Sequence, residues 1–240
     1  MTQGLPLADE LAVVFTRMSG LLLSHETVSI ALSLITSLAK ETIPGAVGAG
    51  VTMLNENGQE VSAAATGPVV EQADGLQYEL GEGPCLSAWG QRATFRTEDL
   101  RHETRWPRWS KGVQPLGLRA SLSTAIVTGD TSPGAMKVYA ENPGAFGERE
   151  ERLISMFAAQ AAVLLANRQS HDSAQRLSNE LSQALRSRDE ISMAKGITMA
   201  RERIDEETAF AMLIGASRQE GRALSALASA LLRSTAQHWR

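Results

Sequence analysis

The chain has 240 residues, of which 43% are hydrophobic and 21% are charged; this balance supports a folded core and excludes wholesale disorder. The length fits one large domain or two modest ones. The net charge of −4 is uneven: residues 1–185 carry 14 Lys and Arg against 20 Asp and Glu, and residues 186–240 carry 9 against 7. A mildly basic C-terminal part permits a phosphate-bearing partner, although ordinary surface variation explains the charge equally well.

Cys85 is the only cysteine, which excludes an intramolecular disulfide and fits a reducing compartment. The first residues place the acidic pair Asp9-Glu10 before their apolar run, which is the opposite of a secretory signal. No apolar run approaches the roughly 20 residues that span a bilayer. We therefore expect a soluble, cytoplasmic protein without a membrane partner.

Proline and glycine divide the chain near residue 145. All eight prolines lie at or before Pro143, and only four of the twenty glycines lie at or after Gly147. Because these residues concentrate in turns, the first part is expected to be rich in turns and the second almost wholly helical.

Residues 1–145 are predicted to form an α+β domain. Apolar residues at helical spacing cover Asp9–Leu23 and Glu26–Ile43. Asn57-Gly58 predicts a tight hairpin, since both central residues of that turn adopt positive φ, and residues 129–134 predict a longer one. The expected strands, which form one antiparallel sheet covered by helices, are Val47–Leu54, Gln59–Thr66, Ala93–Thr97, Leu122–Val127 and Ala135–Ala140.

A long helix is predicted from Phe146 to about Lys195, because no proline interrupts this stretch. Within it, a series of residues is spaced by three and four, as in a coiled-coil seam: Ala174, Leu177, Leu181, Ala184, Arg188 and Ile191. We expect residues 146–187 to form a parallel coiled coil in a homodimer. The alternative is a pair of antiparallel helices with a break between Asn167 and Ser173.

Residues 188–240 are predicted to form an all-α bundle of three helices, the first of which continues the coiled coil. Asp205 suits the N-cap of a helix Glu206–Ala216, with acidic residues 205–207 at its positive end. Gly221 marks the turn before a last helix from Arg222 to about Arg233. The expected core residues are Phe210, Leu213, Leu224, Leu227 and Leu231.

Two sets of residues carry resemblances to known families. The stretch Arg186–Leu232 resembles the ANTAR domain, a small helical RNA-binding module of transcription antiterminators, through Ala194-Lys195-Gly196, Met199, Arg201, Ala209-Phe210, Leu213, Ser217, Arg222, Leu224 and Ala228. The first part resembles the GAF sensor domain that is fused to ANTAR in actinobacterial regulators, through Leu80-Gly81-Glu82-Gly83-Pro84-Cys85, Trp89, Asp99-Leu100, Arg105-Trp106-Pro107 and Pro143-Gly144-Ala145-Phe146.

The resemblance implies an RNA-binding transcription antiterminator. Its ANTAR domains would bind paired hairpins with six-base loops in mRNA leaders and prevent terminator formation. The GAF domain would sense a small-molecule ligand or another state, and the coiled coil would transmit that signal. The residues expected to contact RNA are Arg188, Ala194, Lys195, Gly196, Met199, Arg201, Ser217 and Arg222.

Gly196 stands inside a predicted helix, where glycine costs about 1 kcal/mol relative to alanine. Small residues at 194 and 196 are expected to leave a notch through which an RNA loop approaches Lys195. Unpaired loops are where proteins read RNA sequence. The alternative is that Ala194 and Gly196 allow tight packing between helices, with Lys195 merely solvated.

The candidate ligand-pocket residues of the sensor part are Cys85, Trp89, Arg105 and Trp106. Pro84 suits the first position of a helix, and a thiol at a helix start can act as a redox or ligand sensor. We favour the alternative, a buried apolar thiol. Arg105-Trp106 fits either the aromatic wall of an anion pocket or a packing device at a helix start.

The sequence has no metal-ligand cluster, phosphate loop or dinucleotide fingerprint, and no histidine is placed to activate Cys85. We therefore expect no metal, no cofactor and no enzyme activity. Two other classes of function stay open as alternatives. Residues 206–233 also fit a helix-turn-helix that binds DNA, or the tail of a sensor dimer is a protein-interaction module.

Overall fold

The computed structural model describes residues 25–54 and 60–237. The chain divides into two compact units, Met1–His171 and Asp172–Arg240. The elements of the first unit, in chain order, are α2 (His25–Thr42), β1 (Gly48–Leu54), β2 (Glu60–Ala65), α3 (Pro68–Leu80), α4 (Pro84–Gln91), β3 (Thr94–Thr97), α5 (Pro107–Val113), the 3-10 turn η1 (Gln114–Leu116), β4 (Ala120–Thr128) and β5 (Thr131–Ala140). A long helix, α6 (Glu148–Glu202), begins in the first unit and ends in the second, which also contains α7 (Glu206–Glu220) and α8 (Leu224–Gln237).

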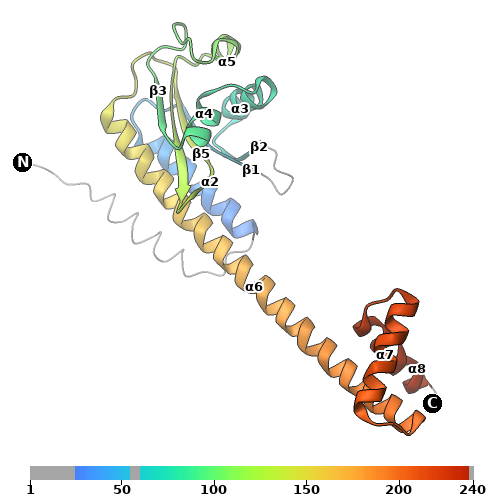
Figure 1. Cartoon of the computed structure of the whole chain (residues 1–240). Helices are drawn as coiled ribbons and strands as arrows, with labels where there is room; N and C mark the ends of the chain where they lie inside the picture. Colours follow the sequence, from blue (N-terminus) through green and yellow to red (C-terminus); the bar gives the residue numbers. More distant parts are fainter. Residues whose placement is uncertain (1–24, 55–59, 238–240) are drawn as a thin grey trace, which may run out of the picture. The chain divides into compact units, whose positions relative to one another are not determined.

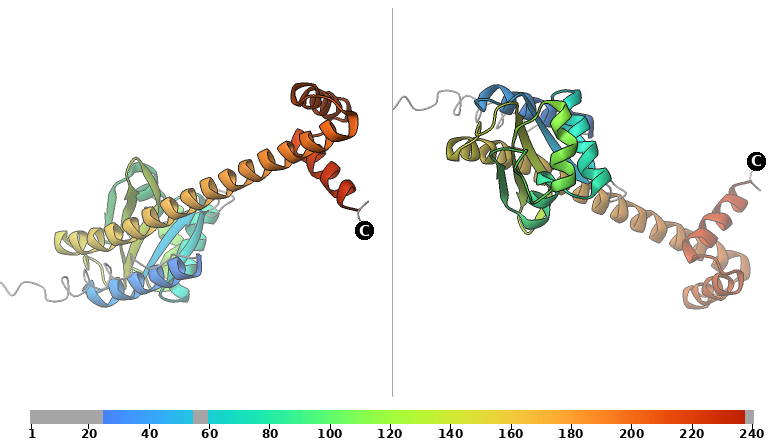
Figure 2. Two further views of the ribbon diagram at one scale, coloured as in Figure 1. Left: turned by 90° about the horizontal axis from the view of Figure 1, so that it is seen from below. Right: turned by 90° about the horizontal axis from the view of Figure 1, so that it is seen from above.

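The first unit is built on a five-stranded antiparallel sheet with the strand order β2-β1-β5-β4-β3. Helix α2 and the first part of α6 cover one face, and α3, α4 and α5 cover the other (Figure 1). Figure 2 shows the same three layers from two further directions.

The alternation of side chains along β5 fills both layers. Met136 and Val138 pack with α2 and α6 in the main core, whereas Ala135 and Tyr139 pack with α4 and with α3 and α5 on the opposite face. Successive side chains of a strand point to opposite faces, so a strand covered on both sides is apolar throughout. Among the buried residues of β5 the exception is Lys137, which pairs with the buried Asp74.

The sheet confirms the five predicted strands, each with shifts of a few residues at its ends. The predicted helix Glu26–Ile43 is observed as α2. The predicted helix Asp9–Leu23 and the Asn57-Gly58 turn lie outside the described residues. Helix α3 was not predicted, because polar residues lie on its buried side, including Asp74 and Gln77, which are fully buried.

Helix α6 is continuous over 55 residues, so the alternative with a break between Asn167 and Ser173 is wrong. In the single chain, Leu177 and Leu181 are 67% and 60% exposed. The last residue of the predicted seam is different: Ile191 packs against the core of the second unit. The prediction is therefore wrong for Ile191, because that side chain already has a partner within its own chain; the rest of the seam stays a prediction.

The second unit has a small core between its three helices. Ala194 of α6, Leu213 of α7 and Ala228 of α8 are buried there, and the side chains that pack around them are Ile191, Leu224, Leu227 and Leu231. Four of the five predicted core residues are thus confirmed. The prediction for the fifth, Phe210, is wrong, because its side chain is 39% exposed.

The residues predicted to start and end α7, Asp205 as the N-cap and Gly221 in the turn that follows, are confirmed. The Asp205 carboxylate accepts a hydrogen bond from the backbone N–H of Thr208 at 2.8 Å, as an N-cap does. Gly221 follows the last turn with φ of 63°, a left-handed conformation that glycine adopts at low cost. In the described ranges, no helix combines the length and the apolar character that a membrane span requires.

Candidate nucleic-acid interface

Lys195 lies on α6 beside the first turn of α7. Its ammonium group forms an ion pair with the carboxylate of Glu206, and its side chain is 21% exposed. The hydrogen bond from Lys195 lowers the pKa of the Glu206 carboxyl, and the positive charge of Lys195 adds to that effect. The Lys195 Nζ atom also lies 5.7 Å from the centroid of the Phe210 ring. The cation is thus held at the surface by an exchangeable partner, since surface ion pairs are weak.

Gly196 and Ala194 have opposite environments. Gly196 is exposed, and a Cβ atom added to it would meet no atom within 4 Å. Ala194 is fully buried in the core with Leu213 and Ala228. The expected notch with a small residue on either side of Lys195 is therefore corrected: Ala194 is small because helices pack on it, and it offers no surface to a partner. Only Gly196 leaves the backbone open beside Lys195.

Two further candidate residues share the side of α6 that carries Lys195. Arg188 lies seven residues before Lys195 and Met199 lies four residues after it, so the helical repeat places them on one face. The Arg188 side chain is 75% exposed, with an Asp189 carboxylate oxygen 3.6 Å away. Met199 is half-buried. This face presents two cations and an open stretch of backbone.

Arg201 connects two helices of the second unit. Its guanidinium Nη2 donates a hydrogen bond to the Thr235 hydroxyl of α8 at 2.9 Å, although the residue is exposed. This contact ties the end of α6 to α8.

Ser217 and Arg222 close the turn between α7 and α8. The Ser217 hydroxyl donates to the Arg222 carbonyl oxygen at 2.6 Å, and the Arg222 guanidinium pairs with Glu220 at 3.0 Å. At 1.5 Å of rise per residue, Ser217 lies roughly 16 Å along α7 from Glu206. The two residues therefore do not join the group around Lys195.

Phe210 lies at the surface near Lys195, although the sequence pattern predicted it to be a core residue. It lies one turn after Glu206 on α7, beside the buried Ala209. The apolar stripe of α7 is broad enough to include it, and the sequence does not show which edge of that stripe the other helices cover. A phenylalanine at the edge of the apolar stripe of α7, close to a lysine of α6, is the feature that could have identified Phe210 as a surface residue.

Three of the four candidate residues of the first unit lie on α4 or contact it. Cys85 is fully buried, and burial raises the pKa of its thiol, which confirms the buried thiol that we favoured. The Trp89 indole donates to the Ser132 carbonyl oxygen, and the Trp106 indole donates to the Ser87 hydroxyl at 2.8 Å.

Arg105 is engaged by neighbouring groups of its own chain. Its guanidinium lies 4.5 Å from the Trp106 ring centroid and pairs with the Glu103 carboxylate at 2.6 Å. Burial alone would raise the pKa of Glu103, but hydrogen bonds from Arg105 and Thr97 lower it to about 2. This arrangement matches the packing device more closely than the anion pocket, because the arginine already has its anion.

A buried ion pair lies between the sheet and α3. The Lys137 ammonium binds the Asp74 carboxylate and donates to the Thr52 hydroxyl at 2.8 Å, and both charged side chains are 0% exposed. Gly50 on β1 makes room for it, since a Cβ there would lie 2.7 Å from the Lys137 Cε atom. Within the described ranges, no group of three or more His, Cys, Asp or Glu side chains is placed to hold a metal ion.

The sequence matches two family models, one for each part. Residues 25–166 match the GAF domain, and residues 179–240 match the ANTAR domain. The chain is therefore a regulator in which a sensor domain precedes an RNA-binding antitermination module. It belongs to the GAF–ANTAR family. No curated protein matches the sequence.

Solved GAF domains share the fold of the first part. The GAF domain region of a protein from Geobacter sulfurreducens PCA is 17% identical, with a TM-score of 0.50, and the match covers 57% of this chain and 92% of that chain. The GAF domain from Acinetobacter phosphoenolpyruvate-protein phosphotransferase is 15% identical, with a TM-score of 0.50 and coverage of 71% and 97%. At such identities the likeness concerns the fold alone.

Proposed function

We propose that this protein is a homodimeric transcription antiterminator. Each ANTAR module binds one of two paired hairpins with six-base loops in an mRNA leader, and the bound RNA no longer forms the terminator. The sensor domain controls this binding. In this proposal residues 1–145 form the sensor, residues 146–187 the dimerisation helix and residues 188–240 the RNA-binding module.

The observation that carries the proposal is the surface at Lys195 and Gly196. Lys195 forms its ion pair with an exposed carboxylate, so an RNA phosphate can replace that carboxylate at little cost. Gly196 lets a partner approach the backbone next to the cation, since no side chain stands there. Arg188 on the same face is a further cation, 75% exposed in the single chain, and it stands at the C-terminal end of the predicted seam. Unpaired loop nucleotides offer phosphates and open base edges to such a surface.

The proposed dimer is supported by apolar side chains on α6 that are exposed in the single chain. The seam residues Leu177 and Leu181 are 67% and 60% exposed, and Leu185, which lies next to the seam position Ala184, is 46% exposed. The predicted seam can be extended from Ala174 toward the start of α6 with the same alternating spacing of three and four residues. Two of the positions that it then includes, Val163 and Met156, are each 50% exposed. A row of exposed apolar side chains at heptad spacing is covered when two such helices pair.

A small molecule is the proposed input of the sensor domain. A cavity of about 200 Å³ lies among α2, β1 and the start of α3, and its lining includes the charged Lys40 and Glu141 and the apolar Val47, Val70 and Leu118. This volume is below the range of about 300–1,000 Å³ that is usual for ligand sites. A ligand of few heavy atoms fits it. Cys85, Trp89, Arg105 and Trp106 do not line this cavity.

Competition between nucleic acids tests the class of partner. Labelled two-hairpin RNA is bound to the full chain and challenged with unlabelled hairpin RNA or with duplex DNA of equal charge. Displacement by the RNA alone is expected. Displacement by duplex DNA at equal concentration would favour the helix-turn-helix alternative, and no binding at low salt would leave the module as a protein-interaction tail.

A further inference from the structure

Phe210 is an aromatic side chain in an unusual place. The described residues include nine aromatic side chains, and Phe210 is the one that is exposed. The other eight lie in the first unit, buried or half-buried. Single exposed apolar residues are ordinary on protein surfaces, so exposure alone does not mark a site. What distinguishes Phe210 is its neighbour.

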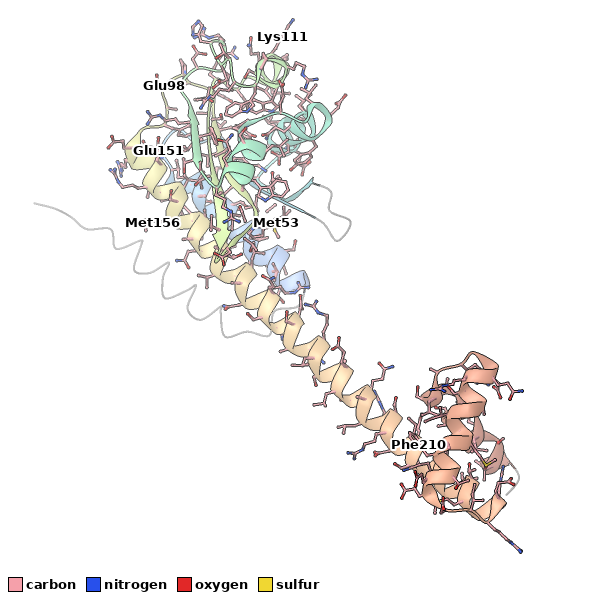
Figure 3. All side chains as sticks on the ribbon, in the orientation of Figure 1. Met53, Glu98, Lys111, Glu151, Met156 and Phe210 are labelled. Carbon is pink, nitrogen blue, oxygen red and sulfur yellow. The ribbon has the colours of Figure 1, made fainter. Side chains whose placement is uncertain are left out.

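The ring and the cation of Lys195 form one feature of the surface. The Lys195 Nζ atom lies 5.7 Å from the ring centroid, within the range of a cation–π contact. Phe210 and Glu206 are one helical turn apart on α7, so both flank Lys195. Figure 3 shows Phe210 on the second unit, near α6. Phe210 follows the buried Ala209 on α7, so the ring is presented from a helix that packs against the core of its unit.

We propose that Phe210 stacks on an unpaired base of the RNA loop, while Lys195 binds the phosphate next to that base. This inference rests on the proposed function and names the residue that takes the base. Bases that are splayed out of a loop stack on aromatic side chains, and the neighbouring backbone is bound by cations. The Phe210 ring can therefore stack on the base of a nucleotide while the Lys195 ammonium group binds the adjacent phosphate.

Binding in this arrangement exchanges one anion for another. In the free protein Lys195 is held by Glu206. When the phosphate arrives, it takes the place of the Glu206 carboxylate, and the ring is already beside the incoming base. The loop thus gains a stacking surface without a rearrangement of the helices.

The test uses the full chain and single-position changes in both partners. The variants are Phe210→Leu, which keeps an apolar side chain without a ring, and Phe210→Trp, which enlarges the ring. Met212→Leu is the matched control, since Met212 is a 48% exposed apolar residue on the same helix. Each protein is titrated with two-hairpin RNA, and with RNAs in which one loop base at a time is replaced by an abasic residue.

Phe210→Leu is expected to weaken binding of the intact RNA by roughly tenfold, because stacking on an aromatic side chain contributes that much per base. One abasic position is expected to abolish the difference between the native chain and Phe210→Leu, and this is the base that stacks. Phe210→Trp and Met212→Leu are expected to bind as the native chain does. A merely structural role would not produce this dependence on one loop base.

The outcomes separate the two proposals. If the native chain distinguishes intact from abasic loops but Phe210→Leu does so equally well, the stacking inference is overturned and the RNA-binding function stands. The same holds if Phe210→Leu weakens binding equally for every abasic RNA, since the ring then acts through the fold. If the native chain shows no dependence on the loop at all, the proposed function fails, and the inference fails with it.

Discussion

Lys195 and Glu206 form an ion pair between α6 and α7 in which the cation is mostly covered and the carboxylate is 68% exposed. An exposed carboxylate on a nucleic-acid-binding surface has two effects. It holds the lysine in place in the free protein, and it competes with phosphate for that lysine. The pair is therefore expected to limit the affinity for RNA.

Replacing Glu206 by glutamine removes the competing charge. The variant Glu206→Gln is expected to bind two-hairpin RNA about two- to fivefold more tightly, in line with the small free energies of surface ion pairs. Glu207→Gln is the matched control, because Glu207 is exposed on the same turn and the change in net charge is identical. Equal gains for both variants would mean that the effect is general electrostatic attraction, and that the pair with Lys195 has no special part.

Gly196 and Gly215 allow a matched comparison inside one module. Both are exposed helical glycines with no atom within 4 Å of an added Cβ. Each change to alanine is expected to stabilise its helix by up to about 1 kcal/mol, measured by thermal or urea unfolding. Gly196→Ala is expected to weaken RNA binding severalfold, because its methyl group keeps the loop away from the backbone beside Lys195.

Gly215→Ala is expected to leave RNA binding unchanged. A Gly196→Ala variant that is more stable and binds RNA as well as the native chain would show that the glycine is not kept for close approach.

The seam on α6 predicts the oligomeric state. Leu181→Asp places a charge at a position that pairs with the same residue of a second copy, so dissociation to monomers is expected in sedimentation or light scattering at micromolar concentration. Gln183→Asp is the control, because Gln183 is exposed on α6 and lies outside the series of seam residues. A Leu181→Asp chain that stays dimeric would place the dimer contact elsewhere.

The buried pair of Lys137 and Asp74 predicts a large effect on stability. Lys137→Met removes the cation and leaves the carboxylate uncompensated in the interior, which is expected to destabilise the first unit by about 3–5 kcal/mol. The double change Lys137→Met with Asp74→Leu is expected to recover part of that loss, since neither charge is then buried alone. Urea unfolding followed by tryptophan fluorescence measures both. A loss below about 1 kcal/mol for Lys137→Met would contradict the account of this pair.

The sheet and the long helix were predictable because their signals are local. The strands are apolar runs bounded by turn residues, and the absence of proline after Pro143 allows one helix as long as α6. Helix α3 could not be predicted in the same way, because its buried face includes the polar residues Asp74 and Gln77 and so lacks a regular apolar spacing. Lys137, the partner that permits the burial of Asp74, lies 63 residues later in the sequence. Gln77 accepts from the Cys85 backbone N–H and donates to the Tyr139 hydroxyl, and Tyr139 lies 62 residues later.

The binding surface was predictable only in part, for a similar reason. The sequence pattern around Lys195 identified the correct helix, but it did not separate Ala194, which faces the core, from Gly196, which faces outward. That separation depends on where α7 and α8 pack. The same packing decides that Leu213 is buried and Phe210 is exposed, although both belong to one apolar stripe of α7.

RNA recognition by the surface at Lys195 is tested most directly by affinity measurements on two full chains, the native chain and Lys195→Ala. Each is titrated with two-hairpin RNA and, as the control, with a loop-scrambled RNA. We expect the native chain to prefer the intact loops, and Lys195→Ala to lose this preference while its unfolding temperature stays near that of the native chain. Equal binding to scrambled loops, or a Lys195→Ala chain that binds as well as the native one, would contradict the claim that this surface recognises RNA.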